Sequence, residues 1–181
     1  MGTTFHRRIA ALASIGFLVL FPYSPAWSDS SDWYGGVALS NTQQETTFSD
    51  GSGFDVDRVN VRLKFGRLFW DYLSFEAQFG LMGQSNITED PVFTSGVYAR
   101  LQKNFDSFGL YALVGAGNVQ TLDNEDGGDE VSQSGGSFGF GLALYGNEYN
   151  AGSALFLEVL RLVNSNETDV DSVGIGYQFL F

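Results

Sequence analysis

The chain has 181 residues, no cysteine, and a formal net charge of −12 that arises from 21 acidic and 9 basic residues. This acidic balance argues against nucleic acid as a partner, because binding to a phosphate backbone needs clustered lysine and arginine. The absence of cysteine excludes a disulfide scaffold, so another device, such as a closed ladder of strands, has to stabilise the fold.

The N-terminus has the pattern of a secretory signal peptide. His6, Arg7 and Arg8 precede an apolar run over residues 9–21, and small residues follow at positions 26 and 28. The run is shorter than the roughly 20 residues that a membrane-spanning helix needs, and the small residues fit a cleavage site. We expect residues 1–28 to be removed, leaving residues 29–181 as one domain exported to a Gram-negative cell envelope.

The mature part has an all-β composition, with abundant glycine, scarce proline and no sustained helical period. The alternation is clearest over 73–84, where Phe75 and Phe79 alternate with Glu76 and Gln78. Over 109–119 both faces are apolar, so the inward face stays open there. Eight segments with a two-residue period are predicted as strands: 32–41, 58–69, 73–84, 94–103, 109–119, 135–145, 152–162 and 170–181. Each has about the length of a tilted membrane strand, roughly 9–11 residues.

The predicted connections alternate in length. The long ones are 42–57, 85–93, 120–134 and 163–169, and the short ones are 70–72, 104–108 and 146–151. An outer-membrane barrel with both termini in the periplasm places its long connections outside the cell and its short ones inside. The long connections contain many carboxylates, among them Glu45, Asp55, Asp57 and Asp169, and no lysine or arginine. The pattern predicts an eight-stranded antiparallel up-and-down transmembrane β-barrel with acidic extracellular loops.

Aromatic residues gather near the predicted periplasmic ends of the strands, as in the interfacial girdle of a membrane barrel. They are Trp33, Phe69, Trp70, Tyr72, Phe105, Phe108, Tyr145, Tyr149, Phe179 and Phe181.

Charged residues occupy the strand face opposite the apolar one. The predicted interior network consists of Arg62, Lys64, Glu76, Arg100 and Glu158. An eight-stranded barrel is just wide enough inside for side chains, so we interpret these residues as a structural plug, with an ion path as the alternative. Glu76 is expected to pair with Arg100, whereas Glu158 reaches Arg62 or Lys64 only across the barrel. A soluble ligand-binding barrel would show the reverse polarity, apolar inside and polar outside.

Four segments together resemble the small eight-stranded OmpA-like outer-membrane barrel family. They are Trp33-Tyr34-Gly35-Gly36, Ser74-Phe75-Glu76-Ala77, Gly139-Phe140-Gly141-Leu142 and the terminal Gly176-Tyr177-Gln178-Phe179-Leu180-Phe181. The resemblance implies that Gly176, Tyr177, Phe179 and Phe181 are the signal read by the outer-membrane assembly machinery, after escort by periplasmic chaperones. It also implies lipid and lipopolysaccharide as partners. No further domain follows the barrel in this sequence, so cell-wall anchoring is not expected.

The sequence also bears on an enzymatic site and on a calcium site. The sole histidine, His6, lies in the predicted signal peptide, and the mature part has no thiol, so neither a lipid A-modifying enzyme nor a cofactor is expected. The acidic stretch 123–130 invites a calcium hypothesis with Asp123, Glu125, Asp126, Asp129 and Glu130 as ligands, although it does not match the twelve-residue calcium loop. The alternatives are a solvated surface, or divalent cations bridging these carboxylates to lipopolysaccharide phosphates. The expected role is structural or surface-interacting, with a narrow porin-like channel as the alternative.

Overall fold

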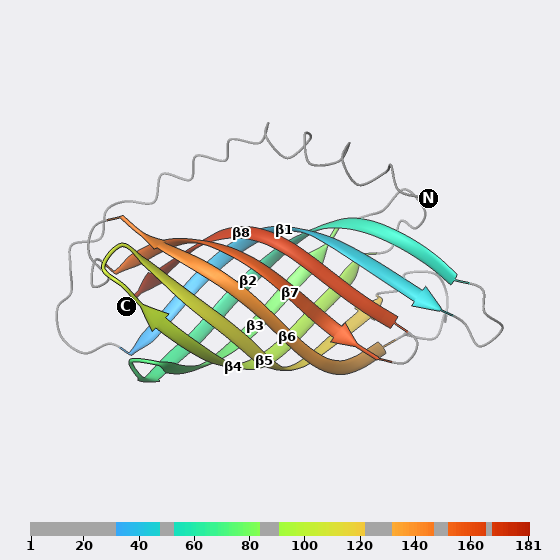
Figure 1. Cartoon of the computed structure of the whole chain (residues 1–181). Helices are drawn as coiled ribbons and strands as arrows, with labels where there is room; N and C mark the ends of the chain where they lie inside the picture. Colours follow the sequence, from blue (N-terminus) through green and yellow to red (C-terminus); the bar gives the residue numbers. More distant parts are fainter. Residues whose placement is uncertain (1–31, 48–52, 84–90, 122–131, 147–151, 166–167) are drawn as a thin grey trace, which may run out of the picture.

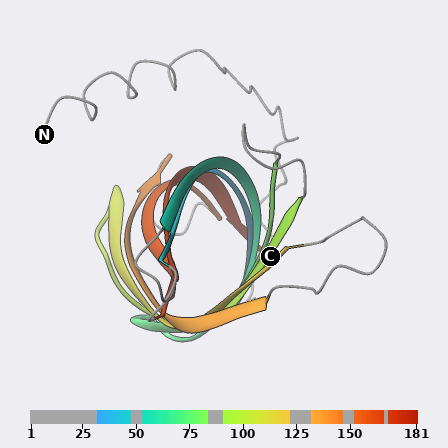
Figure 2. The same cartoon turned by 90° about the vertical axis from the view of Figure 1, so that its right-hand side faces the viewer.

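The strands of the computed structural model form a closed antiparallel barrel (Figure 1). It describes residues 32–47, 53–83, 91–121, 132–146, 152–165 and 168–181, so the predicted signal peptide lies outside the described residues. The strands are β1 (Trp33–Thr47), β2 (Gly53–Trp70), β3 (Leu73–Met82), β4 (Val92–Asn104), β5 (Phe108–Thr121), β6 (Ser132–Tyr145), β7 (Ser153–Asn164) and β8 (Thr168–Leu180). Each strand pairs with the next along the chain, and β8 pairs with β1. Figure 2 shows the resulting ring end-on. The predicted fold class is confirmed.

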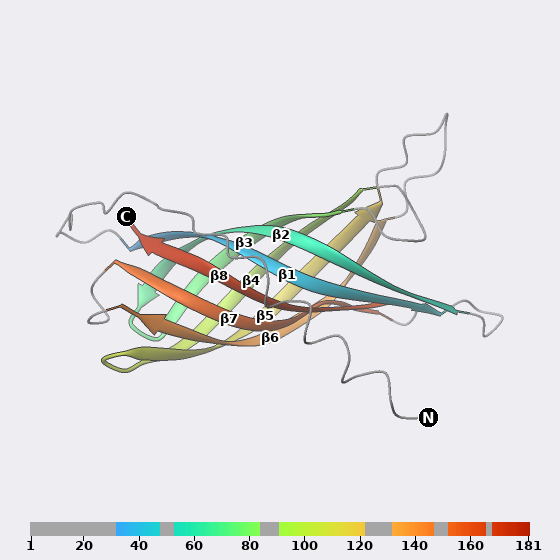
Figure 3. The same ribbon diagram turned by 90° about the horizontal axis from the view of Figure 1, so that it is seen from above.

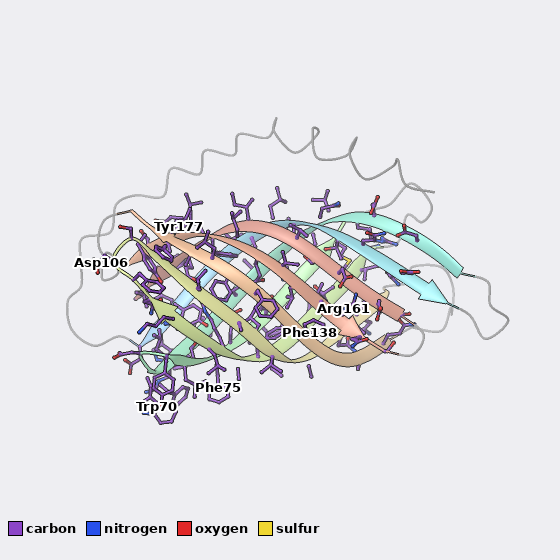
Figure 4. All side chains as sticks on the ribbon, viewed as in Figure 1. Trp70, Phe75, Asp106, Phe138, Arg161 and Tyr177 are labelled. Atoms are coloured by element: carbon purple, nitrogen blue, oxygen red, sulfur yellow. The ribbon has the colours of Figure 1, made fainter. Side chains whose placement is uncertain are left out.

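The two-residue period of the sequence determines which side chains face outward. In β3, Phe75 and Phe79 are exposed whereas Glu76 and Gln78 are buried. In β5, whose inward face the sequence left open, Tyr111 and Leu113 point inward. Because successive side chains of a strand point to opposite faces, each strand contributes one apolar row to the exterior. Phe75 projects away from the barrel wall in Figure 4, and Phe138 is exposed as well.

β1 and β2 are longer than the alternation predicted. β1 continues to Thr47 instead of ending at 41, and β2 begins at Gly53 instead of 58, with the two strands paired up to Thr47 and Gly53. The two strands run beyond their neighbours at one end of the barrel (Figures 1 and 3). The prediction ended where the outward residues turn polar, but backbone pairing does not require apolar side chains on either face.

The predicted alternation of long and short connections is wrong in two places. Segment 48–52 is short, and segment 165–167 is shorter than segment 146–152. We call the end where β1 begins and β8 ends the terminal rim; it carries the tight turns 71–72 and 105–107. The opposite rim carries segments 48–52, 83–91, 122–131 and 165–167. No helix within the described ranges is long and apolar enough to cross a membrane.

Inward aromatic rings fill the barrel by lying over inward glycines. A Cβ atom on Gly66 would collide with the ring of Tyr34, one on Gly141 with Tyr111, and one on Gly176 with Phe156. A glycine within a strand allows this close approach of another group. Small inward residues on β2, β6 and β8 thus make room for large ones on β1, β5 and β7.

Gly141→Ala is expected to lower the free energy of unfolding by roughly 1–3 kcal/mol, the usual cost of forcing extra atoms into a packed interior. The new methyl group would displace the Tyr111 ring. Chemical denaturation of the refolded barrel measures the change. Gly136→Ala on the same strand is the matched control, because its added Cβ meets nothing within 4 Å. Equal stability of the two variants would contradict the packing role of Gly141.

Part of the interior near the opposite rim is apolar, beside buried polar residues such as Thr42, Arg58 and Ser172. Here Met82 and Val92 meet residues from β5, β7 and β8 in one buried cluster. The members toward this rim are Met82, Val92, Leu113, Val119, Leu160, Leu162, Val163 and Val170. We call this set the apolar plug.

Candidate functional site

The five charged residues predicted to face inward all lie in the barrel interior. Arg62 and Lys64 come from β2, Glu76 from β3, Arg100 from β4 and Glu158 from β7, and each is almost completely buried. Burying a charge is costly unless it is paired and hydrogen-bonded. The partners of each carboxylate therefore determine whether the network stabilises the barrel.

Glu158 binds cations that project from the other side of the barrel. Its Oε1 lies 3.2 Å from Nη1 of Arg62, and its Oε2 pairs with Nζ of Lys64. The hydroxyl of Tyr111 donates to Oε2 at 3.0 Å. Because β7 and β2 are not neighbours in the sheet, these ion pairs span the lumen, as the sequence indicated.

Glu76 is the second centre of the network. Its Oε2 lies 3.4 Å from Nη1 of Arg100, the pair that the sequence favoured, and accepts a hydrogen bond of 2.8 Å from the Tyr34 hydroxyl. Lys64 Nζ lies 3.5 Å from Glu76 Oε1 and also pairs with Glu158, so one ammonium joins both carboxylates. The network is therefore continuous from β4 through β3 and β2 to β7.

Tyr34 and Tyr111 are the network members that sequence reasoning missed. Both donate their hydroxyls to a carboxylate, and the Arg100 guanidinium lies 3.8 Å from the ring centroid of Tyr111. Two inward glutamines add to the network: Gln78 accepts from Arg62 at 3.0 Å and Gln178 from Arg100 at 3.1 Å. The two-residue period from Trp33 would have placed Tyr34 inward. No such signal identifies Tyr111, because both faces of its strand are apolar.

A small pocket at the terminal rim leads toward this network. Tyr34, Arg100, Gln102 and Gln178 contribute to its lining, together with Tyr145. Tyr145 was predicted to belong to the outer aromatic girdle, and this is wrong. Its side chain faces inward, and its hydroxyl donates to Asn104 Oδ1 at 2.7 Å. Tyr145 lies four residues after Gly141 on β6, so the two-residue period places both on the inward face.

The outer surface at the terminal rim carries the predicted aromatic girdle. Trp33 stacks on Phe65 with ring centroids 5.1 Å apart, and Phe105 stacks on Phe108 at 4.6 Å. Trp70 stands out from the barrel wall in Figure 4. The exposed members are Trp33, Phe69, Trp70, Tyr72, Phe105, Phe108, Phe179 and Phe181. Tyr149, also predicted here, lies outside the described residues.

The outer surface at the opposite rim is acidic. The outward carboxylates there, which we call the acidic ribbon, are Glu45, Asp55, Asp57, Asp169 and Asp171. All lie in paired strands β1, β2 and β8, so the prediction that the first four belong to loops is wrong. Arg161 from β7 pairs with Asp171 at 2.8 Å and with Asp169 at 3.2 Å. Figure 4 shows Arg161 in this half of the barrel.

The five candidate calcium ligands, Asp123, Glu125, Asp126, Asp129 and Glu130, lie outside the described residues. Within the described part of the chain, no group of three or more histidine, cysteine, aspartate or glutamate residues could hold a metal ion.

The predicted assembly signal forms the end of β8, beside the start of β1. Gly176 lies under the Phe156 ring, and Tyr177 is the register partner of Val37. The backbone N–H of Phe181 donates to Trp33 O at 3.1 Å. The ring centroids of Phe179 and Phe181 lie 5.7 Å apart. The strand thus closes the barrel, and its role as a signal stays a prediction.

Comparison with known proteins places the fold among small outer-membrane barrels. No model of a known protein family matches the chain, and no curated protein matches it. Among solved structures, Neisserial surface protein A covers 85% of this chain and 100% of its own, with a TM-score of 0.59 and 14% identity. Ail, the attachment invasion locus protein of Yersinia pestis, solved in complex with the heparin analogue sucrose octasulfate, covers 83% and 99%, with a TM-score of 0.55 and 15% identity. The N-terminal β-barrel domain of Pseudomonas aeruginosa OprF covers 81% and 97%, with a TM-score of 0.57 and 11% identity. The chain thus has the fold of these eight-stranded outer-membrane barrels.

Proposed function

We propose that the chain is an integral protein of the bacterial outer membrane, with a closed barrel and a structural or surface-interaction role. The observation that carries the proposal is the polarity of the barrel. Its exterior exposes large apolar side chains such as Leu63, Phe79 and Ile175, while its interior buries Arg62 and Glu158. A protein surrounded by water would bury the first set and expose the second. A lipid bilayer around the barrel accounts for both the apolar exterior and the charged interior.

The edges of the apolar band support a membrane position. At the terminal rim the band ends in the aromatic girdle, and toward the opposite rim its last apolar residues include Val59 and Val173. The next outward residues are Asp57 and Asp171, the first carboxylates of the acidic ribbon. Aromatic residues concentrate at membrane interfaces, and carboxylates favour water. The acidic ribbon would project from the cell surface, with the terminal rim in the periplasm.

The chain's lack of cysteine provides a direct test of this orientation. A single cysteine replacing Glu45, exposed on the acidic ribbon, should react with a membrane-impermeant maleimide on intact cells. A single cysteine replacing Asp106, exposed in the turn 105–107, should react only after the outer membrane is permeabilised. Figure 4 shows Asp106 at the terminal rim. Reaction of both on intact cells, or recovery of the protein outside the outer-membrane fraction, would overturn the proposal.

The interior disfavours the alternative of a channel. The charged network spans the lumen from β2 to β7, and the apolar plug occupies part of the described interior toward the opposite rim. Hydrophobic constrictions oppose the entry of water and ions. We expect the refolded protein to show no stable conductance steps above the lipid leak in planar bilayers. Reproducible unitary steps that change in size with Glu158→Gln would support a channel instead.

The acidic ribbon limits the surface partners. Ail was solved with sucrose octasulfate, a polyanion. Here the ribbon carries five carboxylates and only Arg161 beside them among the described residues, so it would repel such a ligand. The surface partners of this chain are therefore neutral or cationic. Lipid and lipopolysaccharide surround the barrel, and divalent cations at the acidic loops would bridge to lipopolysaccharide phosphates. No enzymatic activity is part of the proposal.

Deleting Phe181 should strongly reduce the amount of barrel assembled in cells while changing the stability of the refolded barrel much less. Phe181 directly follows β8 and belongs to the predicted signal that we propose the assembly machinery reads, after delivery by periplasmic chaperones. Quantifying folded protein in outer-membrane fractions, alongside denaturation in vitro, separates the two effects. Phe105→Ala, which removes another exposed aromatic at the same rim, is the control. Equal assembly of all three proteins would contradict the signal.

A further inference from the structure

An exposed charge pair lies within the aromatic girdle at the terminal rim. Arg67 of β2 points outward with 46% of its side chain exposed, and its Nη2 lies 4.0 Å from Oδ2 of Asp32, whose side chain is 57% exposed. At this distance the two side chains share no hydrogen bond. Exposed ion pairs of this kind contribute little to stability. Both charged groups are therefore open to a ligand outside the barrel wall.

Aromatic rings position the guanidinium of Arg67. Its Cζ lies 5.3 Å from the ring centroid of Trp33 and 5.4 Å from that of Phe69. Trp33 in turn stacks on Phe65, and Phe69 meets Phe75 edge to face with ring centroids 5.3 Å apart. The rings attract the guanidinium and restrict where it points. Its planar set of N–H donors matches the oxygens of a phosphate group.

The order of groups toward the terminal rim is that of a phospholipid. The outward row of β2 runs from Leu63 through Phe65, both exposed and apolar, to Arg67. Asp32 directly precedes Trp33, the register partner of Arg67, and so lies nearer the rim. Apolar surface, guanidinium and carboxylate thus follow one another from the apolar band to the rim. A phospholipid with an amine headgroup presents acyl chains, a phosphate and an ammonium group in the same order.

The charges at this rim favour a headgroup that carries both signs. Among the described residues, the exposed charges of the terminal rim are Arg67 and Lys103 against Asp32, Asp71 and Asp106. This surface has no excess of positive charge, so an anionic headgroup gains no general attraction there. A zwitterion with its phosphate beside Arg67 and its ammonium group beside Asp32 would match both charges of the pair.

We propose that Arg67 and Asp32 bind the headgroup of a phospholipid that carries a phosphate and a primary ammonium group, as phosphatidylethanolamine does. Arg67 donates to the phosphate, Asp32 accepts from the ammonium group, and the acyl chains lie along Phe65 and Leu63. This inference rests on the proposed membrane location and names one lipid class for the leaflet at the terminal rim. The trimethylammonium group of phosphatidylcholine has no N–H to donate, and phosphatidylglycerol has no ammonium group. The site therefore distinguishes lipids that share the same phosphate.

Fluorescence quenching at Trp33 tests the site, because this indole lies beside Arg67. Replacing Trp27 and Trp70 by phenylalanine leaves Trp33 as the sole tryptophan. This parent protein is refolded into phosphatidylcholine vesicles that contain increasing fractions of one lipid brominated on its acyl chains, since bromine quenches indole fluorescence. Phosphatidylethanolamine should bind about three- to fivefold more strongly than phosphatidylcholine, the range that one exposed ion pair contributes. Phosphatidylglycerol should show no such preference.

Substitutions at exposed positions separate the headgroup contact from general contact with lipid. Asp32→Asn should abolish the preference for phosphatidylethanolamine and favour phosphatidylglycerol instead, because Arg67 then lacks its neighbouring carboxylate. Adding Arg67→Gln to that variant should remove the preference for phosphatidylglycerol too. Asp106→Asn, which neutralises another exposed carboxylate at the same rim, is the matched control and should behave like the parent.

The outcomes distinguish the headgroup site from the membrane location. Equal quenching by all three lipids would overturn the site and leave the location standing. A preference for phosphatidylethanolamine that persists in Asp32→Asn would also overturn the site, because it would reflect an effect of this lipid on the whole bilayer. If no brominated lipid quenched Trp33, the membrane location itself would be contradicted, and the site with it.

Discussion

Glu158→Gln is expected to lower the free energy of unfolding of the refolded barrel by about 3–5 kcal/mol, the cost of breaking a buried ion pair from one side. The carboxylate of Glu158 pairs with both Arg62 and Lys64 and accepts from the Tyr111 hydroxyl. A neutral amide at this position would remove the negative charge that compensates the buried cations of Arg62 and Lys64. Glu76→Gln, which removes the partner of Arg100, should fall in the same range.

Denaturant titration in detergent micelles measures this loss, and the faster migration of folded barrels on unheated gels provides a second measure. Glu45→Gln is the matched control, because Glu45 is exposed on the acidic ribbon, and exposed pairs contribute about 0–1 kcal/mol. Replacing Lys64 and Glu158 together by apolar residues should recover part of the lost stability, since buried pairs are costly to desolvate. An unchanged midpoint for Glu158→Gln would show that the network contributes nothing.

Leu63→Arg is expected to cost about 2–4 kcal/mol in a lipid bilayer, the depth-dependent penalty for arginine on the lipid face of a barrel near the midplane. Leu63 is 59% exposed in the middle of β2, between Val37 and Phe79 on the neighbouring strands. Nothing in the protein would clash with an arginine pointing outward there. The loss therefore reports only on the medium that surrounds the barrel.

Asn41→Arg is the control for this experiment. Asn41 also points outward and is exposed, but it lies on β1 at the edge of the apolar band, beside Val59 and Val173. The penalty near an interface falls to about 0–1 kcal/mol. Unfolding of both variants from lipid vesicles, measured by tryptophan fluorescence, gives the comparison. If Leu63→Arg were as stable as the wild type and more soluble in water, the apolar face would not meet lipid.

The strands could be predicted because their signal is local. Side chains of a strand alternate between two faces, so the apolar row of β3 is visible in the order Phe75, Ala77, Phe79 without knowledge of any partner. The same signal failed at the far ends of β1 and β2, where the outward residues are polar, although Val56 of β2 still faces inward and is buried. There residues 42–47 pair with 53–58, and this contact between segments extends β1 over residues 42–47, which have no apolar period of their own.

The sequence predicted which charged residues belong to the interior network better than it predicted how they contact each other. The alternation placed Arg62, Glu76 and Glu158 inward, and the narrow lumen of eight strands made contact between them necessary. The contribution of Tyr111 could not be found in this way, because its strand is apolar on both faces. Its position over Gly141 depends on the register between β5 and β6, which no local pattern specifies.

The sequence alone determined the eight-stranded barrel and the charged character of its interior, because both follow from the period of two and from residue type. It also identified the terminal strand from Gly176 to Phe181. The tertiary structure decided which charges meet and that Lys64 joins both carboxylates. It also placed Glu45, Asp55, Asp57 and Asp169 on strands, where the sequence had predicted loops. These features arise from closure of the sheet, which brings side chains from non-adjacent strands together across the lumen.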